Sequence, residues 1–281
     1  MNHGISILFR AIPLVMALFC FSYGACVYAA GDDPARLTAG PVIFFLGSIC
    51  TALYCTASTI IRQIIGTYNE AARYLFPTVA YAFALTTLVC GLFIASTGNA
   101  GSYVAGHAVC GLGLITACVA TAATASTRFS LIPLNSSATP GTINARGFGR
   151  GTVAALIAVP VIMSLAAWVW TAMLFITGTT AAHTVAGSVM AGIACVCTSL
   201  VALVASIARQ VRGSYGSRER ARWSSLVLVM GGAAFLFGLV MIFARWGGAT
   251  DFVGFILIGL GLICWSISSK VILLARIWHA D

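Results

Sequence analysis

The sequence predicts an all-α integral membrane protein with eight transmembrane helices. We expect four tandem, parallel helical hairpins related by pseudo-symmetry about the membrane normal. Three observations support this: the composition, the alternation of charge between connections, and internal repetition. Of the 281 residues, 60% are hydrophobic and 7% are charged. Soluble domains average about 25% charged residues, so a soluble globule, a disordered chain and a nucleic-acid-binding domain are excluded.

Eight apolar stretches are long enough to cross a bilayer, which takes roughly 20 residues in a helix. The first could also be interpreted as a signal peptide, because Arg10 precedes an apolar run and Val27-Tyr28-Ala29 resembles a cleavage site. The repetition described below favours its retention as a span. The expected spans are 8–30, 39–61, 75–97, 103–127, 152–177, 184–208, 224–245 and 252–275.

The connections between the spans alternate sharply in charge. One side carries only Arg36 and Arg245, whereas the other side carries the remaining thirteen of the 15 Lys and Arg residues. Because cytoplasmic loops are enriched in Lys and Arg, this bias predicts that both termini lie in the cytoplasm. The thirteen are Arg10, Arg62, Arg73, Arg128, Arg146, Arg150, Arg209, Arg212, Arg218, Arg220, Arg222, Lys270 and Arg276.

The second helix of each expected hairpin aligns with the other three without gaps. Each has a glycine near its outer end and an arginine near its inner end, in one register. The glycines are Gly40, Gly106, Gly187 and Gly254, and the arginines are Arg62, Arg128, Arg209 and Arg276. The first helix shares in the repetition, because Ile12-Pro13-Leu14-Val15-Met16 matches Val159-Pro160-Val161-Ile162-Met163. The chain therefore reads as one transmembrane domain, 1–281, with hairpins at about 8–63, 75–129, 152–210 and 224–277.

Because each repeat contains two helices, every copy enters the membrane in the same direction. Parallel repeats are related by an axis along the membrane normal, so a pseudo-fourfold or two-by-two bundle is expected. The small residues on the even-numbered helices allow close helix approach. This favours those helices as the inner ring, although the pattern alone leaves the point open.

The four aligned arginines have two interpretations. They are candidates for a ring at the cytoplasmic mouth of a pore, where cationic side chains attract anions. Alternatively, they end the helices, interact with the helix dipole and reach lipid phosphates. Hydroxyl side chains lie just outward of them and could line a polar path or hydrogen-bond within their own helices. The candidate path consists of Thr59, Thr124, Thr127, Ser206 and Ser269.

Two histidines, His107 and His183, lie near the outer ends of their helices. Histidine titrates in mild acid, so both are candidates for sensing pH, and the alternative is two interfacial histidines without such a role. No carboxylate lies within a span, and the ten cysteines contain no C-x-x-C pair or nearby His or carboxylate cluster. We therefore predict no metal site, no cofactor, no catalytic set and no enzymatic activity.

Several stretches together resemble the YhiM-like family of bacterial inner-membrane proteins, over essentially the whole chain. They are VAGH at 104–107, LIPLN at 131–135, IAVPVIM at 157–163, IARQVRGSYGSRE at 207–219 and SKVILLARIW at 269–278. The resemblance implies a multi-pass inner-membrane protein linked to survival at low pH, in a family whose members carry one further C-terminal hairpin. It also implies a V-A-G-H motif in several hairpins, of which only His107 retains the histidine here, since Ser188 stands at the matching position.

Two functional hypotheses follow. The first is an acid-stress protein of channel or transporter type that moves a small solute or anion through the bundle. The second is a non-transporting membrane scaffold or stress protein that supports acid tolerance by binding partners or lipids. The lipid bilayer is the expected partner in both, nucleic acid in neither, and the oligomeric state stays open.

Overall fold

Eight long α-helices form the protein in a computed structural model, which describes residues 3–31, 34–131, 148–244 and 250–277. At several helix edges (3–6, 34, 130–131, 244, 250–251 and 273–277) only the backbone is described. These ranges contain no strand. The helices are α1 (His3–Ala29), α2 (Pro34–Ile64), α3 (Glu70–Ala95), α4 (Ala100–Ala125), α5 (Arg150–Thr177), α6 (Ala181–Val211), α7 (Ser217–Ala244) and α8 (Thr250–Ile277).

All eight helices are long and apolar enough to cross a membrane, so the expected number and order of spans are confirmed. The α-helix α4 ends two residues before its expected end and continues as the 3₁₀ helix η1 (Ser126–Leu131), in which Arg128 has non-helical dihedral angles (φ −122°, ψ 28°). The predicted helix over 103–127 is therefore α-helical only to Ala125. All eight helices begin before their expected starts, and α2, α6 and α8 also extend past their expected ends. Helices α1, α3 and α7 end one or two residues early.

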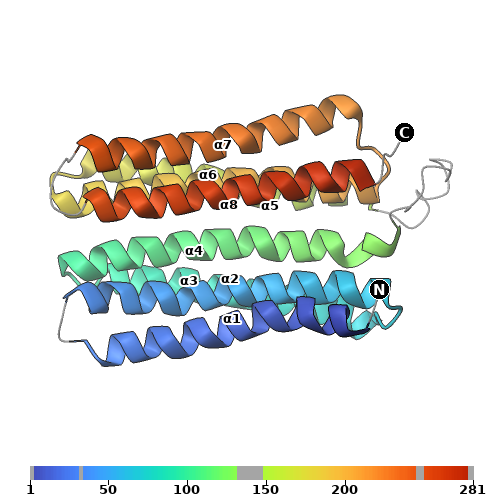
Figure 1. Ribbon diagram of the computed structural model, residues 1–281, viewed down its shortest axis with the longest axis horizontal. Coiled ribbons are helices and arrows are strands. Elements are labelled where there is room, and N and C mark those ends of the chain that lie inside the picture. Colours follow the sequence, from blue (N-terminus) through green and yellow to red (C-terminus); the bar gives the residue numbers. More distant parts are fainter. Residues whose placement is uncertain (1–2, 32–33, 132–147, 245–249, 278–281) are drawn as a thin grey trace.

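The helices run antiparallel, and α1 begins at the same end of the bundle at which α8 ends (Figure 1). We call this the terminus end, and the opposite end, where α1 turns into α2 and α3 into α4, the hairpin end. Asparagine caps two helices: Asn69 accepts a hydrogen bond from Ala72 N (2.9 Å) at the terminus end, and Asn99 accepts one from Ser102 N (2.6 Å) at the hairpin end.

The most extensive contacts lie within four hairpins, α1–α2, α3–α4, α5–α6 and α7–α8. The even-numbered helices also pack against each other in the order α2, α4, α6, α8. Helices α4 and α6 form the centre, because 94% and 89% of their most apolar stretches are buried, compared with 17–39% for the other six helices. The even-numbered helices therefore form an inner row whose two middle members are enclosed.

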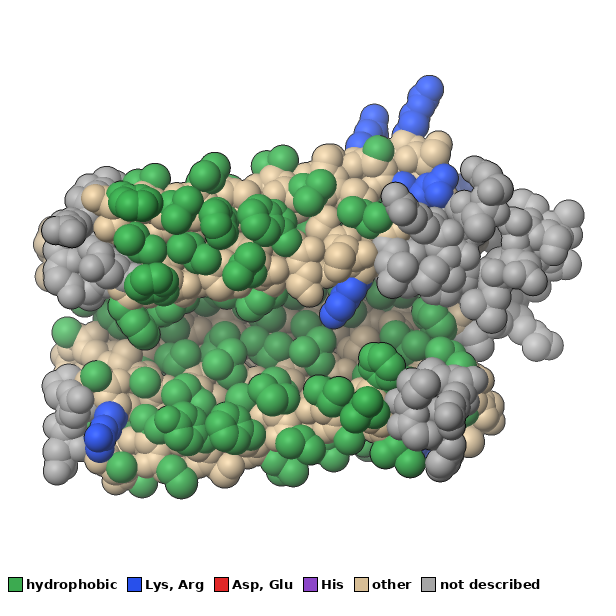
Figure 2. All heavy atoms as spheres, in the orientation of Figure 1, with side chains coloured by type: hydrophobic (Ala, Val, Ile, Leu, Met, Phe, Trp, Pro, Cys, Tyr) green, Lys and Arg blue, Asp and Glu red, His purple; other side chains and the backbone are tan. Residues whose placement is uncertain are grey.

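This row does not close into a ring. In the described part of the chain, α2 and α8 make no contact comparable to those between the other neighbouring even-numbered helices. Figure 2 shows the result as a hollow on the face where α2 and α8 lie, lined by hydrophobic side chains. The expected bundle of hairpins is thus an open arc in this structure.

Glycines set the distance between the two helices of each hairpin. A Cβ on Gly40 would lie 2.8 Å from the backbone nitrogen of Tyr28, and one on Gly106 would collide with the backbone nitrogen of Ala95. Each even-numbered helix has a glycine close to its partner helix. At Gly187 the contact is with the Phe175 ring (3.1 Å), and at Gly254 the carbonyl of Gly238 lies close as well. The four pairs are Gly40 with Tyr28, Gly106 with Ala95, Gly187 with Phe175 and Gly254 with Ile242.

The outer surface of the bundle is apolar between its ends. Large hydrophobic side chains such as Phe93 (72% exposed) and Ile176 (83% exposed) point away from the core. Figure 2 shows hydrophobic side chains over both halves, with most of the visible Lys and Arg gathered toward the terminus end. An apolar surface of this extent is what a protein surrounded by lipid presents.

Candidate functional site

Three of the four aligned arginines, Arg62, Arg128 and Arg209, each contact the segment that follows their own helix. The Arg62 guanidinium lies over the ring of Phe76 in α3 (5.3 Å), and that of Arg128 over Phe148, just before α5 (5.4 Å). Arg209 forms an ion pair with Glu219 in α7. The side chain of Arg276 lies outside the described residues. Arg62, Arg128 and Arg209 lie at or just after the ends of α2, α4 and α6, which are successive members of the inner row.

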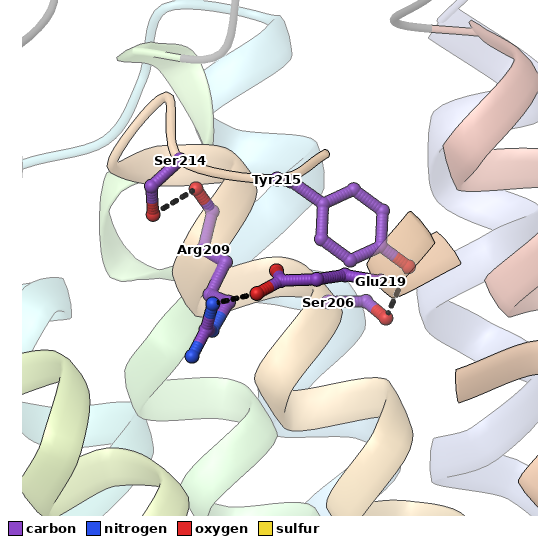
Figure 3. Close-up of polar contacts among 5 residues, drawn as sticks. All are labelled: Ser206, Arg209, Ser214, Tyr215 and Glu219. Atoms are coloured by element: carbon purple, nitrogen blue, oxygen red, sulfur yellow. Dashed lines mark hydrogen bonds and ion pairs between the residues drawn. The ribbon is translucent and has the colours of Figure 1, made fainter. Parts of the chain in front are cut away.

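Arg209 belongs to a compact polar cluster where α6 turns into α7 (Figure 3). Its side chain pairs with Glu219, while the backbone carbonyl of Arg209 accepts a hydrogen bond from Ser214 Oγ (3.5 Å). The hydroxyls of Ser206 and Tyr215 are hydrogen-bonded at 2.9 Å. Burial raises the pKa of the Tyr215 phenol above its usual value, against the lowering effects of the Ser206 hydrogen bond and of Arg220. The cluster therefore fastens the start of α7 to the last two turns of α6.

A glycine in the left-handed region makes this turn possible. Gly213 (φ +73°) ends α6, and Ser214 N donates to the carbonyl of Arg209 (2.9 Å) in a Schellman-type cap. The turn after α2 has the same construction: Gly66 has φ +72°, and Thr67 N donates to the carbonyl of Arg62 (2.9 Å). Both turns come from one sequence pattern, R-Q-x-x-G-[ST]-Y, at 62–68 and 209–215.

Several residues that surround these arginines were not among the site candidates predicted from the sequence. Tyr68, Tyr215, Gln63 and Glu219 were not singled out, although the pattern repeated at 62–68 and 209–215 would have identified the first three. In the structure Gln63 Nε2 donates to the carbonyl of Ser126 (2.6 Å), and so ties the end of α2 to the end of α4. Glu219 has no counterpart in the first copy of the pattern, so only the contact with Arg209 reveals it.

The five hydroxyls of the candidate polar path each donate to a backbone carbonyl three or four residues earlier in the chain. Thr127 donates to the carbonyl of Thr124, another member of the set. Thr59 and Ser206 are buried, whereas Ser269 is exposed on α8. The bonds run from Thr59 to Cys55 (2.8 Å), Thr124 to Ala120 (3.0 Å), Thr127 to Thr124 (2.7 Å), Ser206 to Ala202 (2.7 Å) and Ser269 to Ser266 (2.8 Å).

The two histidines meet at the hairpin end. The ring of Tyr103 lies between them, with centroid distances of 4.3 Å to His107 and 4.8 Å to His183. Trp170 of α5 packs edge-on against His107 (5.6 Å), and Thr180 Oγ1 is hydrogen-bonded to His183 Nδ1 (2.7 Å). His107 is 9% exposed, and both of its ring nitrogens are buried without a hydrogen-bond partner. Sequence spacing identified each histidine but not their shared contact.

A separate apolar cavity of about 510 Å³ opens at the hairpin end between α1, α2 and the α3–α4 turn. Tyr28, Phe44 and Phe93 line it, with Asn99 and Ser102 at its polar edge. The described residues contain no group of three or more His, Cys, Asp or Glu side chains placed to hold a metal ion. All ten cysteines lie in described helices and are free.

Comparisons with known proteins agree with this architecture. A family model described as "Protein of unknown function (DUF2776)" matches residues 1–281. The inner membrane protein YhiM of Escherichia coli (strain K12) is 37% identical over 286 residues, which cover 99% of this chain and 81% of that protein. No solved structure matches the chain. The chain therefore belongs to the YhiM-like DUF2776 family of multi-helix membrane proteins.

Proposed function

We propose that this protein transports a small solute or anion across the bacterial inner membrane and supports survival under acid stress. The observation that carries the proposal is the common register of the glycine contacts in the hairpins. It supports an architecture of tandem repeats in one orientation, an arrangement found in transporters with parallel repeats.

Three of the four even-numbered helices carry a second glycine seven residues after the first, and this glycine also lies close to the partner helix. Seven residues after the first glycine of α2, a Cβ on Gly47 would meet the ring of Phe21 (2.7 Å). The equivalent pairs in the other hairpins are Gly113 with Leu88 and Gly261 with Phe235. Tyr28 and Phe175, like Gly40 and Gly187, are 147 residues apart. We infer that the chain consists of four repeated hairpins in two similar halves, α1–α4 and α5–α8.

We also propose that both termini lie in the cytoplasm. Thirteen of the 15 Lys and Arg residues belong to the connections and helix ends expected on one side of the membrane. Helix α1 begins, and helix α8 ends, at the terminus end of the bundle (Figure 1). With this orientation the arginine cluster of α6 and α7 faces the cytoplasm, and the two histidines face the periplasm.

Transport in this architecture would use the seam between the two halves, where α4 packs against α6. The seam is closed and apolar in this conformation: a Cβ on Gly111 would lie 3.0 Å from Met190 Sδ and would collide with Ile193. A path along it therefore requires the halves to separate, as in transporters that alternate between two conformations.

Accessibility of the seam to water tests the transport proposal. Single cysteines are placed at Thr116 and Thr121 in α4 and at Ser199 in α6, all 0% exposed, in a background without the native cysteines. A charged thiol reagent should label them slowly at pH 7 or pH 5, and reconstituted protein should conduct or exchange anions. Labelling of a control cysteine at the exposed Ser214, without labelling of the three or anion flux, contradicts transport.

The second candidate function is a non-transporting scaffold that binds lipids or partner proteins. The close packing of α4 and α6 favours it, as do the candidate hydroxyls that bond within their own helices. If the reconstituted protein carries no flux while cells that express it survive acid normally, the result supports this alternative. We propose no enzymatic activity, since Glu70 and Glu219, the acids whose side chains are described, lie in the first turns of α3 and α7.

The link to acid stress has its own test. A strain that lacks the gene is challenged at low pH and complemented with the wild-type protein or with His107→Phe. Restored survival with the wild-type protein supports the role. Survival of the deletion strain equal to that of the parent contradicts it.

A further inference from the structure

The two copies of the R-Q-x-x-G-[ST]-Y turn differ in one charge. Arg209 in the second copy is paired with Glu219, the third residue of α7. The corresponding third residue of α3 is Ala72, 147 residues earlier, so the equivalent Arg62 has no carboxylate at that position. The second half of the molecule thus has a carboxylate beside its arginine, and the first half lacks this carboxylate.

Arg62 has no hydrogen bond or ion pair within the described residues. Its guanidinium lies over the ring of Phe76, and its Nε is buried without a partner. The only acid close to it in sequence, Glu70, is exposed and makes no ion pair with it. An arginine has donors and no acceptor, so the buried, unpaired Nε lacks an acceptor, and an anionic oxygen would bind it most strongly.

Ser58 lies on the same face of α2, one turn before Arg62. Tyr54 and Arg62 both contact Phe76, at 6.3 Å and 5.3 Å from its ring centre, and Ser58 is spaced four residues from each. It therefore lies between them, where α2 faces α3. The Ser58 hydroxyl is buried (1% exposed) and has no hydrogen-bond partner among the described residues, although most buried hydroxyls have one.

Tyr68 adds a third unpaired donor at the same turn. Its counterpart Tyr215 is hydrogen-bonded to Ser206 at 2.9 Å, whereas the Tyr68 hydroxyl is buried without a partner. Thr59, which aligns with Ser206, donates to its own helix at Cys55. Tyr68 packs against the cluster that contains Ala72 and Phe76. Arg62, Ser58 and Tyr68 therefore place donors around the start of α3 without a matching acceptor.

We propose that Arg62, Ser58 and Tyr68 form a binding site for a phosphate group, which occupies the place that the Glu219 carboxylate takes beside Arg209. Phosphate oxygens match the donors of arginine and of hydroxyl groups. Because Arg62 is only partly buried at the end of α2, the group can come from a lipid headgroup or from soluble phosphate. Binding at this site requires no passage through the bundle, so the inference stands independently of the proposed transport function.

Binding measurements on the full-length protein test the site. Delipidated protein in neutral detergent is titrated with inorganic phosphate, and protein from nanodiscs containing phosphatidylglycerol is examined by native mass spectrometry for retained lipid. Binding in the first assay identifies soluble phosphate, and retention only in the second identifies a lipid headgroup. In either case Arg62→Gln should weaken binding about tenfold or more. Binding in neither assay overturns the proposal.

Adding a carboxylate to the first half and removing it from the second half gives a sharper test. Ala72→Glu provides a tethered carboxylate and should abolish binding, while Ala72→Gln, of similar size, should retain more of it. Glu219→Ala frees Arg209 and should add a second, weaker site, because Ala205 stands where the first half has Ser58 and the Tyr215 hydroxyl is already bonded to Ser206. If Ala72→Glu does not fold, Arg62→Gln and Glu219→Ala decide the matter. Unchanged affinity in Arg62→Gln together with unchanged stoichiometry in Glu219→Ala refutes the site.

Discussion

Arg209 in the last turn of α6 and Glu219 in the first turn of α7 form an ion pair across the turn that joins these helices. Their side chains are 35% and 32% exposed, so solvent screens the attraction between them. The contact therefore contributes modestly to stability. Its larger effect is to orient the start of α7 beside α6, where Tyr215 meets Ser206.

We expect Glu219→Gln to lower the free energy of unfolding by roughly 0.2–1 kcal/mol, the typical range for solvent-exposed ion pairs. Thermal unfolding in detergent at low and high salt measures the change, and the difference between the two proteins should shrink at high salt. Arg209→Gln combined with Glu219→Gln should cost less than the sum of the two single changes. A loss of several kcal/mol would show that the pair is far more strongly coupled than its exposure indicates.

Gly106→Ala should destabilise the α3–α4 hairpin by about 1–3 kcal/mol, because the added Cβ collides with the backbone of Ala95. Gly259→Ala in α8 is the matched control, since nothing lies within 4 Å of a Cβ at that position. That control should be neutral or slightly stabilising, as alanine favours helices. Equal melting temperatures for the two variants would contradict the close approach at Gly106.

Tyr215→Phe removes the hydrogen bond to Ser206 and should reduce the free energy of unfolding by about 1 kcal/mol near neutral pH. Tyr68→Phe is the control at the equivalent position of the first half, where the hydroxyl has no partner. It should leave stability nearly unchanged in the absence of bound phosphate. A larger loss of stability for Tyr68→Phe than for Tyr215→Phe would contradict the finding that only the Tyr215 hydroxyl has a hydrogen-bond partner.

The raised pKa of Tyr215 predicts a dependence of stability on alkaline pH. Because burial raises the folded-state pKa, the stabilisation is complete below the unfolded-state pKa of about 10 and is lost as pH rises through the folded-state value. Melting temperatures measured from pH 8 to pH 11 should fall above pH 10. Tyr215→Phe should show a smaller decline, and an identical decline would assign the effect to other groups.

His107→Phe should maintain or raise the melting temperature at pH 7. The ring nitrogens of His107 are buried without partners, and such groups cost about 1–3 kcal/mol each in typical cases. Phenylalanine retains a ring that can contact Tyr103 and Trp170. A strong destabilisation would mean that a buried water or ligand satisfies His107 in the membrane.

Most of the secondary structure was predictable, because apolar length and turn chemistry act locally. The repeated glycines were also evident from the sequence, and the structure shows that Gly40 and Gly106 mark close helix contacts. The partners of the candidate residues were not predictable. Arg209 and Glu219 meet through the turn geometry of Gly213, and His107 and His183 meet because α4 and α6 are neighbours. These contacts depend on positions distant in sequence or on backbone angles at one glycine.

By itself, the sequence determined eight membrane-spanning helices, because an apolar run in lipid must satisfy its backbone hydrogen bonds within a helix. Only the tertiary structure decided that α4 and α6 are enclosed while α2 and α8 stay apart. All four even-numbered helices carry similar small residues, so small differences in packing between neighbours select the enclosed pair and leave the arc open. The same holds for Arg62 and Arg209: their turns follow one sequence pattern, but the partner of each arginine comes from the next helix, where Phe76 contacts Arg62 and Glu219 contacts Arg209.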